Sequence, residues 1–282
     1  MKAIILAAGK GTRLRPLTYG IPKPLLPIKG TPMINLVMNS ILHPDLTEII
    51  VGVSGTVGED SQERVLSHIQ GISIDAYLRN LNIGVKIKTI PTPMRETAGD
   101  LRFILEEEGI NKGRVIVAYG DNLTSFNVDA MIKYHEKCRN ALGVVGTVLL
   151  FEAPESDISR FGIARMKKVN DMDLIEFFIE KPHPSQAPSR FANGGYYILE
   201  VEDILERLPR TKTKVEHSLF PQLAAEGKLA GFIAKLPYWI DISTFESYNI
   251  ANKMAYDNLI IAPEVDKNEK HNSNPNSTTP SN

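Results

Sequence analysis

The sequence of 282 residues contains a single cysteine, Cys138, so no disulfide can form within the chain. Disulfide-stapled secreted folds are thereby excluded, and a reducing compartment such as the cytoplasm is the expected location. The sequence also lacks an excess of charge of either sign, because 32 Lys and Arg residues face 33 Asp and Glu residues. Nucleic-acid-binding domains usually carry a clear basic excess, so we expect no nucleic-acid partner.

Long hydrophobic runs and repeats are missing as well. The apolar runs fall well short of the ~20 residues that a transmembrane helix needs. The run at residues 3–8 is too short for the core of a signal peptide, and charged residues follow it. No membrane partner is therefore expected. Because no hexapeptide or longer repeat is visible, a second domain built from repeats is not predicted either.

Buried strands and amphipathic helices alternate through the first 150 residues. Helical apolar spacing occurs at residues 32–42, 61–69 and 100–108. Strands are predicted at residues 3–8, 48–53, 85–90, 114–119 and 141–150, the third of them ending at Pro91. This alternation predicts an α/β, Rossmann-like fold with a mixed, mostly parallel sheet flanked by helices.

The character of the chain changes near residue 150. Short β-like runs then alternate with turn-rich stretches, which predicts a second part of the same domain over about 151–262, after a first part over about 1–150. Residues 263–282 are polar and rich in Asn, Ser, Thr and Pro. Such a segment buries too little apolar surface to order itself, so we predict a disordered tail.

A glycine turn follows the first predicted strand. Gly9 and Gly11 allow backbone N–H groups to approach a phosphate, and Arg13 and Lys23 supply cations nearby. The dinucleotide-binding fingerprint requires a third glycine, but position 14 is leucine. The spacing of the ATPase phosphate loop is also absent. Taken alone, the turn is as compatible with a structural role as with a phosphate site.

A longer string around this turn resembles a known signature. Residues 6–14 (LAAGKGTRL), followed by PLT and PKPLLP, are similar to the opening motif of the sugar-phosphate nucleotidylyltransferases. These enzymes join a nucleoside triphosphate to a sugar 1-phosphate and release pyrophosphate. Later blocks match in the order that the family shows, at residues 96–101, 120–122, 160–162, 180–182, 193–197 and 238–242. The resemblance runs from residue 1 to about residue 262.

The resemblance implies a set of roles for residues of this chain. It implies a nucleotide-binding part over 1–150 and a sugar-binding part over 151–262, with Mg²⁺ as cofactor and a homodimer or homotetramer as the assembly. The catalytic residues would be Arg13 and Lys23, and the metal ligands Asp121 and Asp241. The nucleotide would be bound by Ala8, Gly9, Gly11, Thr12, Arg13, Thr97 and Ala98. The sugar phosphate would be bound by Gly162, Glu180, Lys181 and Asn193.

Three features depart from the family pattern, the smallest being Ser243, which stands where the last block usually has glycine. No glutamine occurs at residues 89–96, shortly before Thr97, although the family usually has one there to read a pyrimidine base. The usual glycine is replaced by Glu96, which has less backbone freedom if the turn needs a positive φ. The block Gly120-Asp121-Asn122 is similar to the thymidylyl- and uridylyltransferase branches, which implies dTTP and glucose 1-phosphate as substrates. UTP or another NTP is the alternative.

Alternative interpretations of the site residues stay open. Asp121 and Asp241 each precede a predicted helix and could serve as its cap. The chain could also be a catalytically silent regulatory subunit of the same fold. Loss of Arg13, Lys23, Asp121 or Asp241 would be the expected sign of such a subunit, and all four residues are present.

Overall fold

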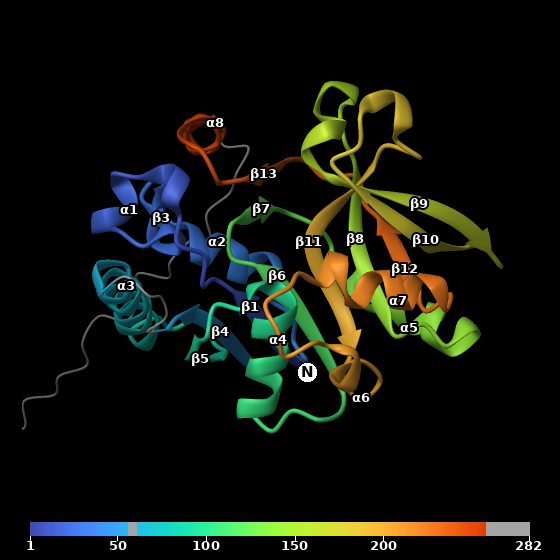
Figure 1. The fold of residues 1–282 in the computed structure, drawn as a ribbon, viewed down its shortest axis with the longest axis horizontal. Helices are drawn as coiled ribbons and strands as arrows, with labels where there is room; N and C mark the ends of the chain where they lie inside the picture. Colours follow the sequence, from blue (N-terminus) through green and yellow to red (C-terminus); the bar gives the residue numbers. More distant parts are fainter. Residues whose placement is uncertain (56–60, 258–282) are drawn as a thin grey trace, which may run out of the picture.

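A computed structural model describes residues 1–55 and 61–257 of the chain (Figure 1). The predicted tail at 263–282 lies outside the described residues. The main sheet of the described chain has nine strands in the order β5-β4-β1-β6-β11-β8-β12-β10-β9. Their bounds are β1 Lys2–Leu6, β4 Glu48–Ser54, β5 Lys86–Thr92, β6 Arg114–Tyr119, β8 Gly146–Glu152, β9 Gly162–Val169, β10 Met172–Glu180, β11 Phe191–Glu200 and β12 Leu229–Ile233.

This sheet has one half with only parallel strand pairs and another half with both parallel and antiparallel pairs. Strands β5, β4, β1 and β6 are parallel to one another. β11 is antiparallel to both β6 and β8, and β10 is antiparallel to both β9 and β12, while β8 and β12 are parallel. The predicted mixed α/β sheet is confirmed, with continuous parallel pairing only in its first half. Short turns between β9 and β10 favour antiparallel hairpins, whereas the long crossovers of the first half allow parallel pairing.

Helices cover both faces of the sheet because successive strand residues point to opposite sides. Ala3 and Ile5 of β1 belong to a core cluster that includes residues of α2, α3, α5 and α8, whereas Ile4 belongs to a second cluster under α4, α6 and α7. Besides the short α1 Leu17–Gly20, the helices are α2 Met33–Ser40, α3 Ser61–Arg79, α4 Glu96–Glu107, α5 Val128–Leu142, α6 Val201–Ile204, α7 Leu219–Ala225 and α8 Phe245–Tyr256. None of the helices in the described ranges is long and apolar enough to cross a membrane.

The two predicted parts of the chain share one sheet. β11, which lies beyond residue 150, is inserted between β6 and β8 of the first part and pairs with both. In Figure 1 β11 accordingly runs through the middle of the molecule, between β6 and β8. Side chains that reach a site from β6 and from β11 therefore have a rigid common support.

Several predicted strand boundaries differ from the structure, including that of β1, which ends at Leu6, and two of the differences have a clear physical cause. β5 continues through Pro91 to Thr92, and this is possible because β5 is an edge strand with one neighbour, where a missing N–H is tolerated. The strand predicted from residue 141 begins at Gly146 instead. Gly143 ends α5 in the left-handed conformation, with its N–H donating to the carbonyl of Arg139, so residues 141 and 142 are helical.

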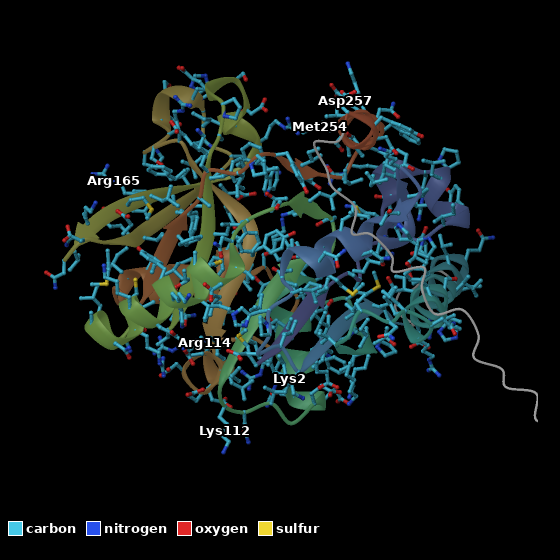
Figure 2. The ribbon with its side chains drawn as sticks, turned by 180° about the vertical axis from the view of Figure 1, so that it is seen from behind. Lys2, Lys112, Arg114, Arg165, Met254 and Asp257 are labelled. Carbon is cyan, nitrogen blue, oxygen red and sulfur yellow. The ribbon has the colours of Figure 1, made fainter. Side chains whose placement is uncertain are left out.

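The parallel strands fix which end of the molecule can hold a site. Figure 2 labels Lys2 and Arg114, the first residues of β1 and β6, at one end, and Met254 and Asp257, near the end of α8, at the other. The carboxyl ends of β1 and β6 therefore point towards the side of α8. In open α/β sheets ligands bind beyond these carboxyl ends.

Candidate functional site

The glycine turn after β1 is tightly fixed. Gly11 has a φ of 63°, and a Cβ atom there would lie only 3.0 Å from Thr18 Cγ2 and 3.2 Å from Lys23 Cβ. The Thr18 hydroxyl donates a hydrogen bond of 2.9 Å to the Gly11 carbonyl. Both the left-handed backbone and the close approach require glycine here. The turn then passes into a short 3-10 helix, η1 (Thr12–Leu14).

The cations of this turn have different surroundings. Lys10 and Arg15 both pair with Glu63 in the first turn of α3, at 3.3 and 2.7 Å. Arg13 is exposed, and its charge partly opposes the rise that burial and the charge of Asp121 cause in the pKa of Asp241. Arg13 is thus the arginine of the turn that acts towards the predicted metal ligands, whereas Lys10 and Arg15 tie the turn to α3.

Lys23 and Asp121 form an ion pair. Lys23 begins a short 3-10 helix, η2 (Lys23–Leu25), between two prolines, and its side chain is only 10% exposed. Asp121 lies between β6 and a short strand, β7 (Asn122–Thr124). The Lys23 Nζ donates to Asp121 Oδ2 over 2.6 Å. A cation from the start of the chain therefore lies at the carboxyl end of the central strand.

Asp241 is brought beside Asp121 by a small two-stranded sheet. β13 (Trp239–Asp241) pairs antiparallel with β7, and the Ile242 N–H donates to the carbonyl of Asp121 over 3.0 Å. Burial raises the pKa of Asp241, the charge of Asp121 raises it further, and Lys23 and Arg13 oppose the shift. Two carboxylates thus share one electrostatic environment.

Neither aspartate caps a helix. The N-cap of α5 is Asn127, whose side chain accepts from the Ala130 N–H, and the N-cap of α8 is Thr244. Across the part of the chain that the structure describes, no group of three or more His, Cys, Asp or Glu residues could hold a metal ion. A pair of carboxylates nevertheless fits Mg²⁺, which usually takes one or two carboxylates from the protein and further oxygens from phosphates.

A cleft of about 600 Å³ opens beyond the ends of β1 and β6. Four of the predicted residues line it, namely Ala8, Gly9, Thr97 and Asp121. Asp241 lines a neighbouring cavity of about 650 Å³, where Phe151 and Trp239 stack with ring centroids 4.9 Å apart. The two aspartates therefore lie at the border between two cavities.

The segment predicted to approach the nucleotide forms the first turn of α4. Glu96 has a φ of 62°, so the glycine position of the family pattern does adopt a left-handed backbone in this chain. The Ala98 N–H donates to the Thr213 carbonyl, and the Thr97 hydroxyl accepts from the Val215 N–H, both over 3.0 Å. The Ala98 N–H is thus directed at Thr213 rather than into the cleft.

Three of the predicted sugar-phosphate residues, Gly162, Glu180 and Lys181, lie at the paired ends of β9 and β10, and Asn193 lies on β11. Gly162 and Glu180 are opposite each other on β9 and β10, and a Cβ on Gly162 would lie 2.9 Å from Glu180 Oε2. Lys181 follows with a φ of 49°, a strained value for a residue other than glycine. Asn193 on β11 donates to the Tyr197 hydroxyl over 3.0 Å. Within the described residues, none of these four lines the 600 Å³ cleft.

One wall of the cleft was missed by the sequence analysis. Lys212, Lys214 and Glu216 line it, together with Tyr119 at the end of β6. The only signal in the sequence is the alternation in residues 211–216 (TKTKVE), which is typical of an extended segment with two different faces. Because the residues on one face are charged, the segment has no apolar periodicity that would identify it as part of a site.

Comparisons with known proteins identify relatives of this chain. The chain is 29% identical to a UTP–glucose-1-phosphate uridylyltransferase of Synechocystis over 88% of its own length and 61% of the relative's. It is 28% identical to a mannose-1-phosphate guanyltransferase of Schizosaccharomyces pombe over 88% of its length and 62% of the relative's. It thus spans about three fifths of the length of both relatives.

A solved structure and a family model complete the comparison. The structure of an apo UDP-glucose pyrophosphorylase superposes with a TM-score of 0.70 at 21% identity, covering 91% of this chain and 98% of the other, which establishes the fold. The model that describes the nucleotidyl transferases matches residues 2–258, nearly all of the chain. This chain therefore belongs to the nucleotidyl transferase family.

Proposed function

We propose that this protein transfers a nucleotidyl group from a nucleoside triphosphate to a sugar 1-phosphate and releases pyrophosphate. The observation that carries the proposal is the Lys23–Asp121 ion pair of 2.6 Å, placed between the fixed glycine turn and Asp241. Asp121 of this pair lines the cleft of about 600 Å³, and Asp241 lines the neighbouring cavity. That volume is in the range of small-molecule and cofactor sites.

The reaction makes limited chemical demands on the protein. An oxygen of the sugar phosphate forms a bond to the α-phosphorus, the bond from that phosphorus to the bridging oxygen of pyrophosphate breaks, and pyrophosphate leaves with the electron pair. A phosphate monoester is already largely deprotonated near pH 7, so no side chain has to act as base. Catalysis then consists of positioning two anions and neutralising their charge.

The residues on the nucleotide side meet that demand. Gly9 and Gly11 leave their backbone open to the triphosphate, with Ala8 and Thr12 beside them. Arg13 is exposed and can bind the β- and γ-phosphates with its planar fork. When the nucleotide binds, Lys23 would release Asp121 and bind the α-phosphate instead.

Asp121 and Asp241 would hold Mg²⁺. When bound, the ion would neutralise charge on the phosphate oxygens and on the leaving pyrophosphate. The raised pKa of Asp241, caused by burial and by the charge of Asp121, marks a repulsion between the two carboxylates that a divalent cation would relieve. On the sugar side, Lys181 would bind the phosphate, Glu180 and Asn193 would orient the hydroxyls, and Gly162 leaves room beside Glu180.

The substrates follow from the resemblance and from the relatives. We propose dTTP and glucose 1-phosphate as the first pair to test, with UTP as the nearest alternative. The relatives named for uridylyl and guanyl transfer make UTP with glucose 1-phosphate and GTP with mannose 1-phosphate the next pairs. A homodimer or homotetramer is proposed as the assembly, to be measured by light scattering.

Pyrophosphate release tests the function directly. Purified protein is incubated with Mg²⁺, each of the five common NTPs and a panel of hexose 1-phosphates. We expect release with at least one pair, and loss of release when EDTA removes the metal. A Lys133→Ala variant, altered in an exposed pair with Asp129 on α5, serves as the active control. Absence of release with every pair would contradict the proposal and favour a silent regulatory subunit.

A further inference from the structure

The segment at residues 211–216 forms one wall of the cleft and presents two faces. Its odd-numbered residues contact α4, since Thr213 exchanges backbone hydrogen bonds with Arg95 and Ala98, and Val215 is buried. Gly99 of α4 permits this contact, because a Cβ there would lie 2.7 Å from the Thr211 carbonyl oxygen. The even-numbered residues, Lys212, Lys214 and Glu216, line the cleft.

The two carboxylate oxygens of Glu216 have unequal surroundings. Oε1 accepts from the Tyr119 hydroxyl at 2.8 Å, from Asn193 Nδ2 at 3.3 Å and from the Tyr197 hydroxyl at 3.4 Å. Oε2 is buried and has no hydrogen-bond partner among the described residues. A buried acceptor left without a donor is costly, and such groups in native proteins usually have a ligand or another explanation.

Glu216 lies where the nucleotide and sugar sides of the site meet. Tyr119, its closest donor, precedes Gly120 and Asp121 at the end of β6, and Asn193 comes from the sugar side on β11. Burial raises the pKa of Glu216, and the charge of Glu180 raises it further, so the two carboxyls are close enough to interact. The orphaned Oε2 therefore lies among the residues proposed to orient the sugar.

The chemistry of Oε2 restricts its ligand. A carboxylate repels phosphate groups, and an acceptor-only oxygen needs a donor. Hydroxyl groups are the donors that a sugar phosphate offers. We propose that Glu216 Oε2 accepts a hydrogen bond from one hydroxyl of the hexose 1-phosphate, which makes Glu216 a specificity-determining residue of this site. The inference rests on the proposed function.

Mono-deoxy substrates test this assignment. Wild-type protein is assayed with the best hexose 1-phosphate and with its analogues that lack one hydroxyl each. We expect one position at which the missing hydroxyl lowers kcat/KM by about 10- to 100-fold through the lost charge-assisted hydrogen bond. In Glu216→Ala the loss at that position should shrink to less than about 2-fold. Glu216→Gln keeps an acceptor for Tyr119, so in this variant the loss of kcat/KM at that position should be intermediate.

Two controls separate recognition from structure. In Glu180→Gln, the loss of kcat/KM at the position assigned to Glu216 should remain. Glu176→Gln, which alters an exposed pair with Arg165, should behave as wild type. If Glu216→Ala lowers kcat/KM equally for all analogues, Glu216 is structural and the inference is wrong. Thermal unfolding shows whether each variant is folded, and the Gln variant provides the test if the Ala variant is not.

The ribose is the other source of hydroxyl groups. NTPs that lack the 2′- or the 3′-hydroxyl are therefore compared in the same variants, and a loss erased by Glu216→Ala at one of these positions would overturn the hexose assignment. Calorimetric titration with glucose 1-phosphate, mannose 1-phosphate and their deoxy analogues repeats the comparison without turnover. If the wild type releases no pyrophosphate but still discriminates one hydroxyl through Glu216, the proposed function fails and the inference stands. If binding shows no such discrimination either, both fail.

Discussion

Lys23 Nζ lies 2.6 Å from Asp121 Oδ2, although the two residues are 98 positions apart in the sequence. The lysine side chain is 10% exposed and the aspartate 37%, so the lysine is the more deeply buried partner. Phosphates and a metal ion compete for the same two groups, since Lys23 can bind an anion and Asp121 a cation. Substrate binding would therefore replace this ion pair rather than add to it.

Removal of either metal ligand should stop turnover without unfolding the protein. We expect Asp121→Ala and Asp241→Ala each to lower kcat by at least about 100-fold, because charge neutralisation at the phosphates is the main catalytic contribution. Pyrophosphate release measures kcat, and circular dichroism verifies the fold. Near wild-type activity in either variant would contradict the metal assignment.

Lys181 should act on sugar-phosphate binding. Lys181→Ala removes the cation but leaves a non-glycine residue at a φ of 49°, so the backbone requirement is unchanged. We expect KM for the sugar 1-phosphate to rise by about 10-fold or more, as for a lost charge-assisted contact, with a smaller change in kcat. Lys181→Arg should recover much of the affinity, and Lys167→Ala on β9 is the matched control. An unchanged KM in Lys181→Ala would count against the assignment.

Glu96 should carry measurable backbone strain. Its φ of 62° costs a non-glycine residue of the order of 1 kcal/mol, so Glu96→Gly is expected to raise the free energy of unfolding by up to about 1 kcal/mol. Glu107→Gly, at the opposite end of α4, should lower it by about 0.5–1 kcal/mol because its backbone is helical. Urea denaturation measures both. Destabilisation by Glu96→Gly would show that the side chain, and not the backbone, decides stability there.

Local features of the chain could be predicted from the sequence. The strand at β1, the turn at Gly9 and Gly11 and the helical layers follow from apolar spacing and from glycine, which act over a few residues. The mixed α/β sheet was also predicted from this local spacing. The extension of β5 through Pro91 was not, because its position at the sheet edge depends on strands elsewhere in the chain.

The contacts between distant residues of the site depend on strand pairing that no local sequence pattern encodes. Asp241 reaches Asp121 only through the pairing of β13 with β7, and the sequence analysis placed them together solely by resemblance. Glu216 was missed because its carboxylate becomes distinctive only when Tyr119, Tyr197 and Asn193 surround one of its oxygens. Those three donors come from two different strands.

Stability should depend on pH through His135. This residue is fully buried, with Nδ1 2.8 Å from Thr147 Oγ1 and Nε2 3.0 Å from Glu200 Oε1. Burial lowers its pKa, and the charge of Arg114 adds to the effect, whereas the hydrogen bond to Glu200 opposes it. The unfolded chain therefore binds a proton at His135 more readily than the folded one. The free energy of unfolding should fall as the pH drops below about 6.5, the unperturbed pKa of histidine.

His135→Gln tests that dependence, because glutamine does not titrate. Urea denaturation at pH 8, 7, 6 and 5 gives the free energy of unfolding of each protein. Between pH 7 and 5 we expect a smaller decrease for His135→Gln than for the wild type, whatever the stability of the variant at pH 8. His183→Gln, which alters an exposed histidine that contacts Ser185, should follow the wild-type curve. Parallel curves for His135→Gln and the wild type would show that another group causes the acid sensitivity.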